Sequence, residues 1–239
     1  MATKTVVLDL KLAWQRVKQE SIGRGFTRHP FEMELAESDL DSWLTNIGRE
    51  FSINAYRPNG VYIANVPKGK GAVRPGACIA LKDRLVYAAC VGAVLHNIRT
   101  ALTWPNRTID FSYPLSQANN DPKWIRGEFQ SWQRFREASL ELLKARPYAV
   151  LADITGYYEN IDLATLRSDL VGTGADESVV TALMVSLNRW AQIGGRGIPQ
   201  GQNTSDILGK LYLNSVDRSL YQYDYLHCRY VDDIRIFCN

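Results

Sequence analysis

The stretch RYVDDIRIF, residues 229–237, decides how the rest of this 239-residue sequence is interpreted. Asp232 and Asp233 stand side by side, and β-branched or aromatic residues flank them on both sides. Such flanks are typical of strands, so the segment predicts a strand, a turn and a second strand. Acids are common in hairpin turns, where their side chains accept hydrogen bonds from nearby backbone amides. Taken alone, the pair is explained by a turn.

A third acid changes that interpretation. Asp153 follows the apolar run that starts at Tyr148, which predicts another short strand. If the strands are neighbours, three carboxylates meet at one rim of a sheet and repel one another in a partly desolvated cleft. Cations relieve that repulsion, and oxygen ligands in this number favour Mg²⁺ or Mn²⁺. Two such ions about 3.5–4 Å apart serve phosphoryl transfer, so the acids predict a two-metal clamp.

The composition limits the class of protein without deciding its partner. Hydrophobic residues make up 46% of the sequence, enough for the core of one large or two small domains. A net charge of +3 permits a polyanionic partner but does not indicate one. The four cysteines form no CxxC pair, so we expect reduced core thiols and neither a zinc site nor a disulfide framework. The charged N-terminus and the short apolar run at 85–95 indicate a cytoplasmic protein with no membrane contact.

Hydrophobic periodicity predicts a chain of helices interrupted by short strands. A hairpin with the cationic tip KGKG is expected from Val61 to Leu81, and residues 105–123 predict a long surface connection. Residues 124–146 interleave aromatic rings with arginines, a composition that either binds nucleic acid or simply buries rings and solvates charges. The helices are expected at 8–22, 38–50, 85–104, 124–146, 162–171, 176–192 and 204–221.

Taken together, these segments resemble a reverse transcriptase. Three motifs of that family's palm stand in order, and two upstream stretches are similar to its fingers. The palm motifs are DITGYYENID (153–162), GIPQGQNTS (197–205) and RYVDD (229–233), and the fingers stretches are KGKGAVRPG and LKDRLVYAA. The resemblance covers roughly residues 60–239.

The resemblance implies an α+β fold with right-hand polymerase fingers and palm, in which an antiparallel palm sheet packs on helices. We expect an N-terminal helical region at 1–59, fingers and fingers–palm helices at 60–146, and a palm at 147–239. The chain stops at Asn239, shortly after the YVDD hairpin. The thumb and the primer-gripping loop are therefore absent from this chain, and we expect these residues alone to bind metal poorly and polymerise little.

The resemblance also implies a role for each motif residue. Asp153, Asp232 and Asp233 are the expected catalytic and metal-binding carboxylates, with Asp232 as the principal and Asp233 as the supporting ligand. The ring of Tyr158 is expected to occupy the space of a ribose 2′-hydroxyl and so favour deoxynucleotides; the alternative is an ordinary half-buried strand tyrosine. The remaining nucleotide-binding candidates are Gln200, Arg74, Lys68, Lys70 and Tyr230, although a solvated hairpin tip also explains the two lysines. Ser205 would begin the helix behind the template base, and Asp83 and Arg84 match a pair that is mostly structural.

The function implied is RNA-directed or untemplated DNA synthesis from dNTPs with two Mg²⁺ or Mn²⁺ ions. The residues of these motifs are most similar to those of the bacterial abortive-infection and defence-associated enzymes, and this similarity implies a role in antiphage defence. The resemblance implies several partners: RNA or DNA as template or product, a non-coding RNA, and further copies of the chain in a homo-oligomer. A retron or group II intron type of reverse transcriptase is an alternative. So is a catalytically silent nucleic-acid-binding module, although the retained acids speak against it.

Overall fold

The structure, a computed structural model, describes residues 8–23, 30–52, 54–68, 71–104, 108–191 and 193–239. Helices and two small antiparallel sheets alternate along the chain, so the predicted α+β class is confirmed. The helices are α1 (Leu10–Gly23), α2 (Pro30–Ser38), α3 (Leu40–Ser52), α4 (Leu81–Ala101), α5 (Glu128–Ala145), α6 (Tyr157–Asn160), α7 (Leu163–Gly172), α8 (Glu177–Trp190), α9 (Asn203–Tyr212) and α10 (Asn214–Gln222). The strands are β1 (Tyr62–Lys68), β2 (Ala72–Cys78), β3 (Tyr148–Asp153), β4 (Leu226–Tyr230) and β5 (Asp233–Cys238).

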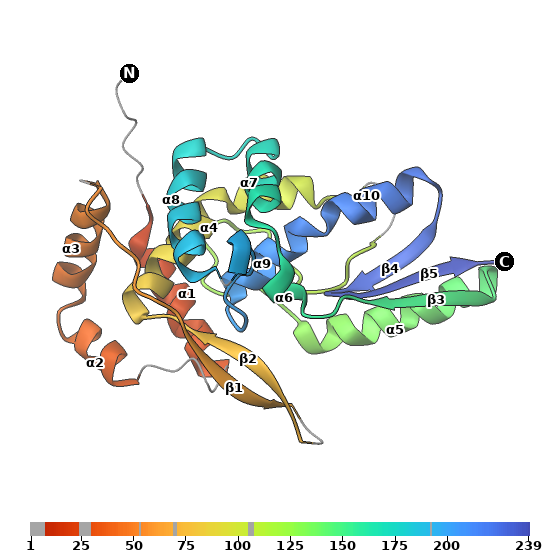
Figure 1. Cartoon of the computed structure of the whole chain (residues 1–239), viewed down its shortest axis with the longest axis horizontal. Coiled ribbons are helices and arrows are strands. Elements are labelled where there is room, and N and C mark those ends of the chain that lie inside the picture. The colour runs from red at the N-terminus through yellow and green to blue at the C-terminus, as the bar shows by residue number, and fades with distance from the viewer. Residues whose placement is uncertain (1–7, 24–29, 53, 69–70, 105–107, 192) are drawn as a thin grey trace.

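Helix α4 is the centre of the fold. Its apolar residues occur on nearly every side, so it is stable only where other helices surround it. Helices α1, α8 and α9 pack against it, and Figure 1 shows it inside the helical half of the molecule. Because α1 contacts α4, the N-terminal segment and the predicted fingers segment share one core.

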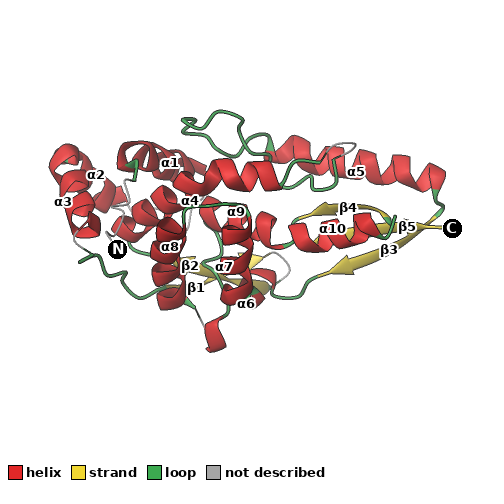
Figure 2. Cartoon of the chain, turned by 90° about the horizontal axis from the view of Figure 1, so that it is seen from above, coloured by secondary structure: helices red, strands yellow, loops and turns green. Residues whose placement is uncertain are grey.

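The two sheets lie apart from each other. The β1–β2 hairpin projects from the helical half, whereas β3, β5 and β4 form a sheet at the far end, where the chain ends (Figure 1). Helix α5 runs along this sheet, as Figure 2 shows from above, and contacts β4 and β5. Strand β3 is an edge strand, and all six of its residues are exposed.

Several expected elements differ from those observed. The single helix expected at 204–221 is two helices, α9 and α10, which meet at Leu213. Leu213 is buried, and Asp217 in α10 turns inward to pair with Arg229, so side-chain burial overrides a continuous helix. Helix α2 was not expected from the sequence, and the predicted strand up to Leu81 stops at Cys78 because Leu81 already belongs to α4.

The connection expected over the surface at 105–123 runs there only in part: residues 117–120 are exposed, residues 105–107 lie outside the described residues, and the stretch around Asp110 enters the interior. Ile109 and the side chain of Asp110 are buried, and this segment pairs with the edge of β4. The backbone N–H of Arg229 donates to the carbonyl of Ile109 (2.9 Å), and Phe111 donates to the carbonyl of Arg229 (2.9 Å). Paired backbone groups can be buried, which is why a polar segment can leave the surface here.

The N-terminal cap expected for α7 is confirmed. Asp162 caps α7 by accepting a hydrogen bond from the backbone N–H of Thr165 (2.8 Å). The four cysteines, all within the described residues, form no disulfide, although two of them are half-buried rather than core residues. Within the described part of the chain, no helix combines the length and apolar character needed to cross a bilayer.

Gly209 in α9 makes room for two tyrosines of α6. A Cβ at this position would lie 3.2 Å from Cε1 of Tyr157 and 3.4 Å from Cε1 of Tyr158. Both rings are buried, so neither can move aside without disturbing the core. Glycine is therefore required here for close packing of α6 on α9.

We predict that Gly209→Ala lowers the free energy of unfolding by about 1–3 kcal/mol, because it overpacks this contact. Urea unfolding followed by circular dichroism measures the change. Gly172→Ala is the matched control: its Cβ would meet nothing within 4 Å at the end of α7. The control should leave stability unchanged or raise it by up to about 1 kcal/mol, and equal losses in both variants would contradict the packing argument.

Candidate functional site

The register of the three-stranded sheet brings the distant acids together. Asp153, the last residue of β3, lies directly opposite Asp233, the first residue of β5. Residues directly opposite in antiparallel strands have Cβ atoms about 4.5–5.5 Å apart. Asp232 precedes Asp233 in the turn between β4 and β5. Residues far apart in the sequence therefore place three carboxylates at one end of the sheet.

The register shows which acids face each other: Asp233 lies opposite Asp153, and the expected order of Asp232 as principal and Asp233 as supporting ligand stays a prediction. Asp153 is exposed and the other two acids are half-buried, so the cluster is only partly desolvated. Arg235 also lies 3.4 Å from Asp233, between Nη2 and Oδ2, and reduces the repulsion. Solvent and this arginine lower the electrostatic cost of gathering the acids.

The donor atoms at this end of the sheet fit a hard divalent cation. Carboxylate oxygens on neighbouring strands are the ligands that Mg²⁺ and Mn²⁺ prefer. Among the described residues, however, no group of three side chains is already gathered closely enough to hold a metal ion. The residues present therefore match the chemistry of such an ion without forming a finished coordination shell.

A narrow cleft, partly open to solvent, lies between the hairpin and the loop before α9. The carbonyl of Gln200 accepts a hydrogen bond from the backbone N–H of Ala77 (3.1 Å), and the side-chain amide of Gln202 donates to the carbonyl of Ala77 (3.3 Å). These two bonds fix the loop to β2. The cleft is lined by Val61, Ile63, Pro75, Ala77, Glu159, Trp190 and residues 197–200, so Gln200 lies in its wall, and its role in binding a nucleotide stays a prediction.

Two glycines shape this loop. Gly197 has φ +95° and Gly201 has φ +96°, values that favour glycine because other residues carry a Cβ. A Cβ on Gly197 would also lie 3.2 Å from the carbonyl oxygen of Glu159. Gly197 is therefore required by its contact with α6 as well as by its backbone conformation.

Tyr158 is a core residue in this structure. It lies in helix α6, is 7% exposed, and its hydroxyl donates to Oδ1 of Asp206 (2.6 Å). Burial, and then the nearby charge of Asp206, raise the pKa of Tyr158 well above its ordinary value. The alternative that Tyr158 is a half-buried strand tyrosine is therefore wrong, because Tyr158 lies in a helix and is buried. Sugar selection by the ring stays a prediction, because Tyr158 is not among the residues that line the cleft.

Arg74 and Tyr230, two of the other nucleotide-binding candidates, are not among the residues that line the cleft. Arg74 is exposed, and since Pro75 and Ala77 face the cleft, strand alternation directs Arg74 to the other face of the hairpin. Tyr230 packs on Trp132 of α5, with ring centroids 5.1 Å apart. Lys70 and the side chain of Lys68 lie outside the described residues.

Three further motif residues are buried in protein contacts. The carboxylate of Asp83 accepts hydrogen bonds from the hydroxyl of Tyr56 (2.8 Å) and the backbone N–H of Asn59 (2.8 Å). Arg84 lies 3.3 Å from Glu20 of α1. Ser205 is fully buried in the first turn of α9 and lies 2.9 Å from the hydroxyl of Tyr87. Their contacts join α1, α4 and α9 beneath the cleft.

Sequence analysis missed the residues that support the acid turn. Arg229 is fully buried and binds Asp110 and Asp217, which lie 119 and 12 positions away in the sequence. The sequence offered one signal: an arginine within a segment expected to be a strand. If such an arginine is buried, it requires a buried acid as its partner. Its partners follow no spacing pattern, so the sequence could not identify them.

Comparisons with known proteins agree with this architecture. Residues 66–239 match the family described as reverse transcriptase (RNA-dependent DNA polymerase). No curated protein matches the chain.

Two solved structures share the fold at low identity. The apo telomerase of Candida tropicalis, truncated from its C-terminal domain, is 12% identical, with 75% of this chain and 44% of that chain covered and a TM-score of 0.51. A partial Cas6-RT-Cas1–Cas2 complex is 13% identical, with 95% of this chain and 36% of that chain covered and a TM-score of 0.52. The present chain thus spans less than half the length of either structure.

We predict that Tyr158→Phe lowers the free energy of unfolding by about 1–2 kcal/mol, because Asp206 loses a buried hydrogen bond. Thermal and urea unfolding measure this loss. Tyr223→Phe is the control, since Tyr223 is 78% exposed and its hydroxyl reaches solvent. The same stability for both variants would show that the Tyr158–Asp206 hydrogen bond contributes nothing.

Proposed function

The chain belongs to the reverse transcriptase (RNA-dependent DNA polymerase) family. On that premise, we propose that it adds deoxynucleotides to a primer hydroxyl group, which belongs either to a nucleic acid or to another molecule. The observation that carries the proposal is the position of Asp153 opposite Asp233, with Asp232 beside them in the turn. A scaffold that merely binds nucleic acid gains nothing from three carboxylates that repel a phosphate backbone.

In this proposal, Asp153, Asp232 and Asp233 hold two divalent ions. Mg²⁺ or Mn²⁺, when bound, activates the attacking hydroxyl and stabilises the charge on the leaving pyrophosphate. The chain's own contribution is to position the reactants, which by itself can supply a large part of a rate enhancement. The loop that contains Gln200 is tied to β2, so the nucleotide would bind in a cleft whose two walls are joined.

The more specific assignments rest on sequence resemblance. The wording of DITGYYENID, RYVDD and the stretch around Arg74 supports a defence-associated bacterial enzyme that acts in the cytoplasm. A retron or group II intron type remains the alternative. We also propose that the protein binds a non-coding RNA and forms a homo-oligomer. The regions of the chain in this proposal are 1–59, 60–146 and 147–239.

One observation favours a second candidate, a catalytically silent nucleic-acid-binding module. Arg235 pairs with Asp233, and Asp153 is exposed, so the acids coexist without the need for a metal ion. The two candidates differ in one respect: a silent module incorporates no dNTP, and its acids can be neutralised without consequence. The first of the two experiments below decides between them.

We predict that Asp153→Asn and Asp232→Asn each lower dNTP incorporation by the complete protein by about 100-fold or more, because a neutral amide binds a divalent ion weakly. Primer extension with labelled dNTPs and Mg²⁺ or Mn²⁺ measures the loss, and circular dichroism checks that the fold is retained. Asp162→Asn is the matched control, since asparagine caps α7 as well as aspartate does. Full incorporation by the acid variants would remove the enzyme assignment.

A second prediction concerns sugar selection. Tyr158→Ala should raise incorporation of rNTPs relative to dNTPs, because the ring no longer fills the space of the 2′-hydroxyl. Tyr158→Phe keeps the ring and should keep the selectivity of the wild type. The ratio of kcat/KM for dGTP and GTP, measured below the unfolding temperature of each variant, provides the test. An unchanged ratio in Tyr158→Ala would show that the ring is not the gate.

A further inference from the structure

The turn that carries the candidate acids contains a strained residue. Val231 has φ +57°, in the left-handed region, and it immediately precedes Asp232. A β-branched side chain is rarely found there because its Cβ crowds the backbone. Such a conformation persists where the surrounding structure holds it in place.

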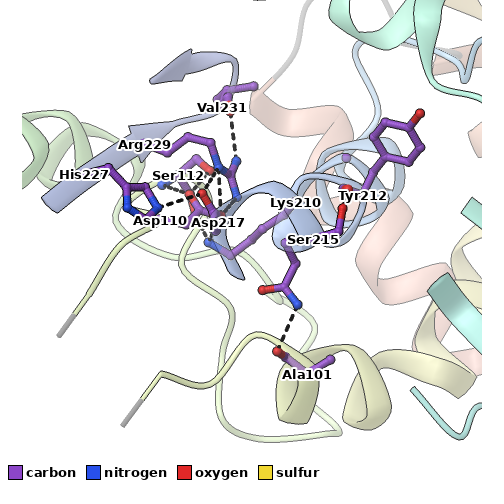
Figure 3. Close-up of polar contacts among 12 residues, drawn as sticks. Ala101, Asp110, Ser112, Lys210, Tyr212, Ser215, Asp217, His227, Arg229 and Val231 are labelled. Carbon is purple, nitrogen blue, oxygen red and sulfur yellow. Dashed lines mark hydrogen bonds and ion pairs between the residues drawn. The ribbon is translucent and has the colours of Figure 1, made fainter. Parts of the chain in front are cut away.

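The side chain of Arg229 provides that hold. Its Nη1 donates a hydrogen bond to the carbonyl oxygen of Val231 (2.9 Å), and its side chain is fully buried (Figure 3). Figure 3 shows the guanidinium between the turn on one side and two carboxylates on the other. The planar group has donors on all sides, so one residue can bond several acceptors at once.

Two carboxylates from separate parts of the chain fix the guanidinium. Asp217 of α10 receives bonds from Nε (3.0 Å) and Nη2 (2.7 Å), and Asp110 receives a bond from Nη2 (3.0 Å). Lys210 of α9 adds a second cation, 2.8 Å from Asp110. Two cations thus face two carboxylates in the interior, and Arg229 cannot rotate away without breaking several bonds.

The electrostatics of the cluster favour the charged forms of Asp110 and Arg229. Burial alone would raise the pKa of Asp110, but Lys210 and Arg229 outweigh burial and lower it. Burial opposes the charge of Arg229, while Asp110 and Asp217 raise the pKa of Arg229 above its ordinary value. Desolvation offsets most of the attraction in a buried ion cluster, so stability by itself does not account for one. A role in fixing one geometry accounts for it better.

We infer that Arg229 is a positioning residue of the active site: anchored by Asp110 and Asp217, it holds the Val231 turn in the conformation that presents Asp232 and Asp233. The inference rests on the proposed function, because it assigns those acids to the reaction. Arg229 itself acts through the turn and contacts neither nucleotide nor primer. The connection at 105–123 thereby takes part in the site, since it supplies Asp110.

The test combines Arg229→Lys with Val231→Gly. Lysine keeps the charge that neutralises the carboxylates, but a single ammonium cannot reach both carboxylates and the carbonyl of Val231. In the complete protein we expect kcat to fall about 10- to 100-fold, with the KM for dNTP unchanged, because the acids are misplaced. The half-saturating Mg²⁺ concentration should rise. A partly unfolded enzyme would lose kcat without that rise.

Glycine at position 231 adopts a positive φ without strain, so it makes the support of Arg229 less necessary. The double variant should therefore recover at least about half of the lost activity on a logarithmic scale, a non-additive result typical of coupled residues. Arg49→Lys, at an exposed position that bonds Asn46, controls for the exchange itself. An equal loss from Arg229→Lys in both backgrounds would overturn the inference, as would wild-type kcat in Arg229→Lys.

A second measurement is independent of activity. Hydrogen exchange of the amides of residues 231–233 should accelerate about 10-fold or more in Arg229→Lys and less in the double variant, because the turn opens locally. If the wild type incorporates no dNTP, the proposed function fails, and hydrogen exchange alone decides whether Arg229 holds the turn. Unchanged exchange at these amides would refute the positioning role.

Discussion

The antiparallel register of β3, β5 and β4 is the constraint on which the candidate site depends. Because side chains alternate between faces, a slip of one residue would move Asp153 to the opposite face of the sheet from Asp233. Packing fixes the β4–β5 part of this register: Phe237 and Cys228 are buried on the face covered by α5, together with Phe135 of that helix. Strand β3 is exposed and contributes no residue to that cluster, so its alignment with β5 rests on backbone pairing along the whole strand, from Tyr148–Cys238 to Asp153–Asp233.

The second half of the site depends on the helical core. The loop with Gln200 is joined to β2 by backbone and side-chain hydrogen bonds, and α9 behind it packs on α4. At Gly209 the same helix accommodates the tyrosines of α6, which directly follow the strand that carries Asp153. Helix α9 and the buried ion cluster at its end therefore connect the cleft to the acids. Helix α9 and the buried ion cluster thus fix the position of the cleft relative to the acids.

Much of the fold was predictable because local signals were strong. The long apolar segment of α4, the Asp162 cap of α7 and the strand-forming flanks of the hairpins are each encoded by contiguous residues. The failures occurred where distant contacts override local preference. Asp110 is buried where it bonds Arg229, and Asp217 bonds the same arginine just after the break at Leu213. No local sequence pattern reveals these contacts. Exposure of β3 was likewise unpredictable, since an apolar run looks the same in a central and in an edge strand.

By itself, the sequence indicated the family, the order of the motifs and the three candidate acids, since these are properties of residue type and spacing. Tertiary structure decided the rest: that Asp233 is the residue opposite Asp153, that Arg74 faces away from the cleft, and that Tyr158 is bonded to Asp206. The physical reason is that register, strand alternation and burial are fixed by contacts between segments far apart in the chain. Spacing along a sequence does not contain those contacts.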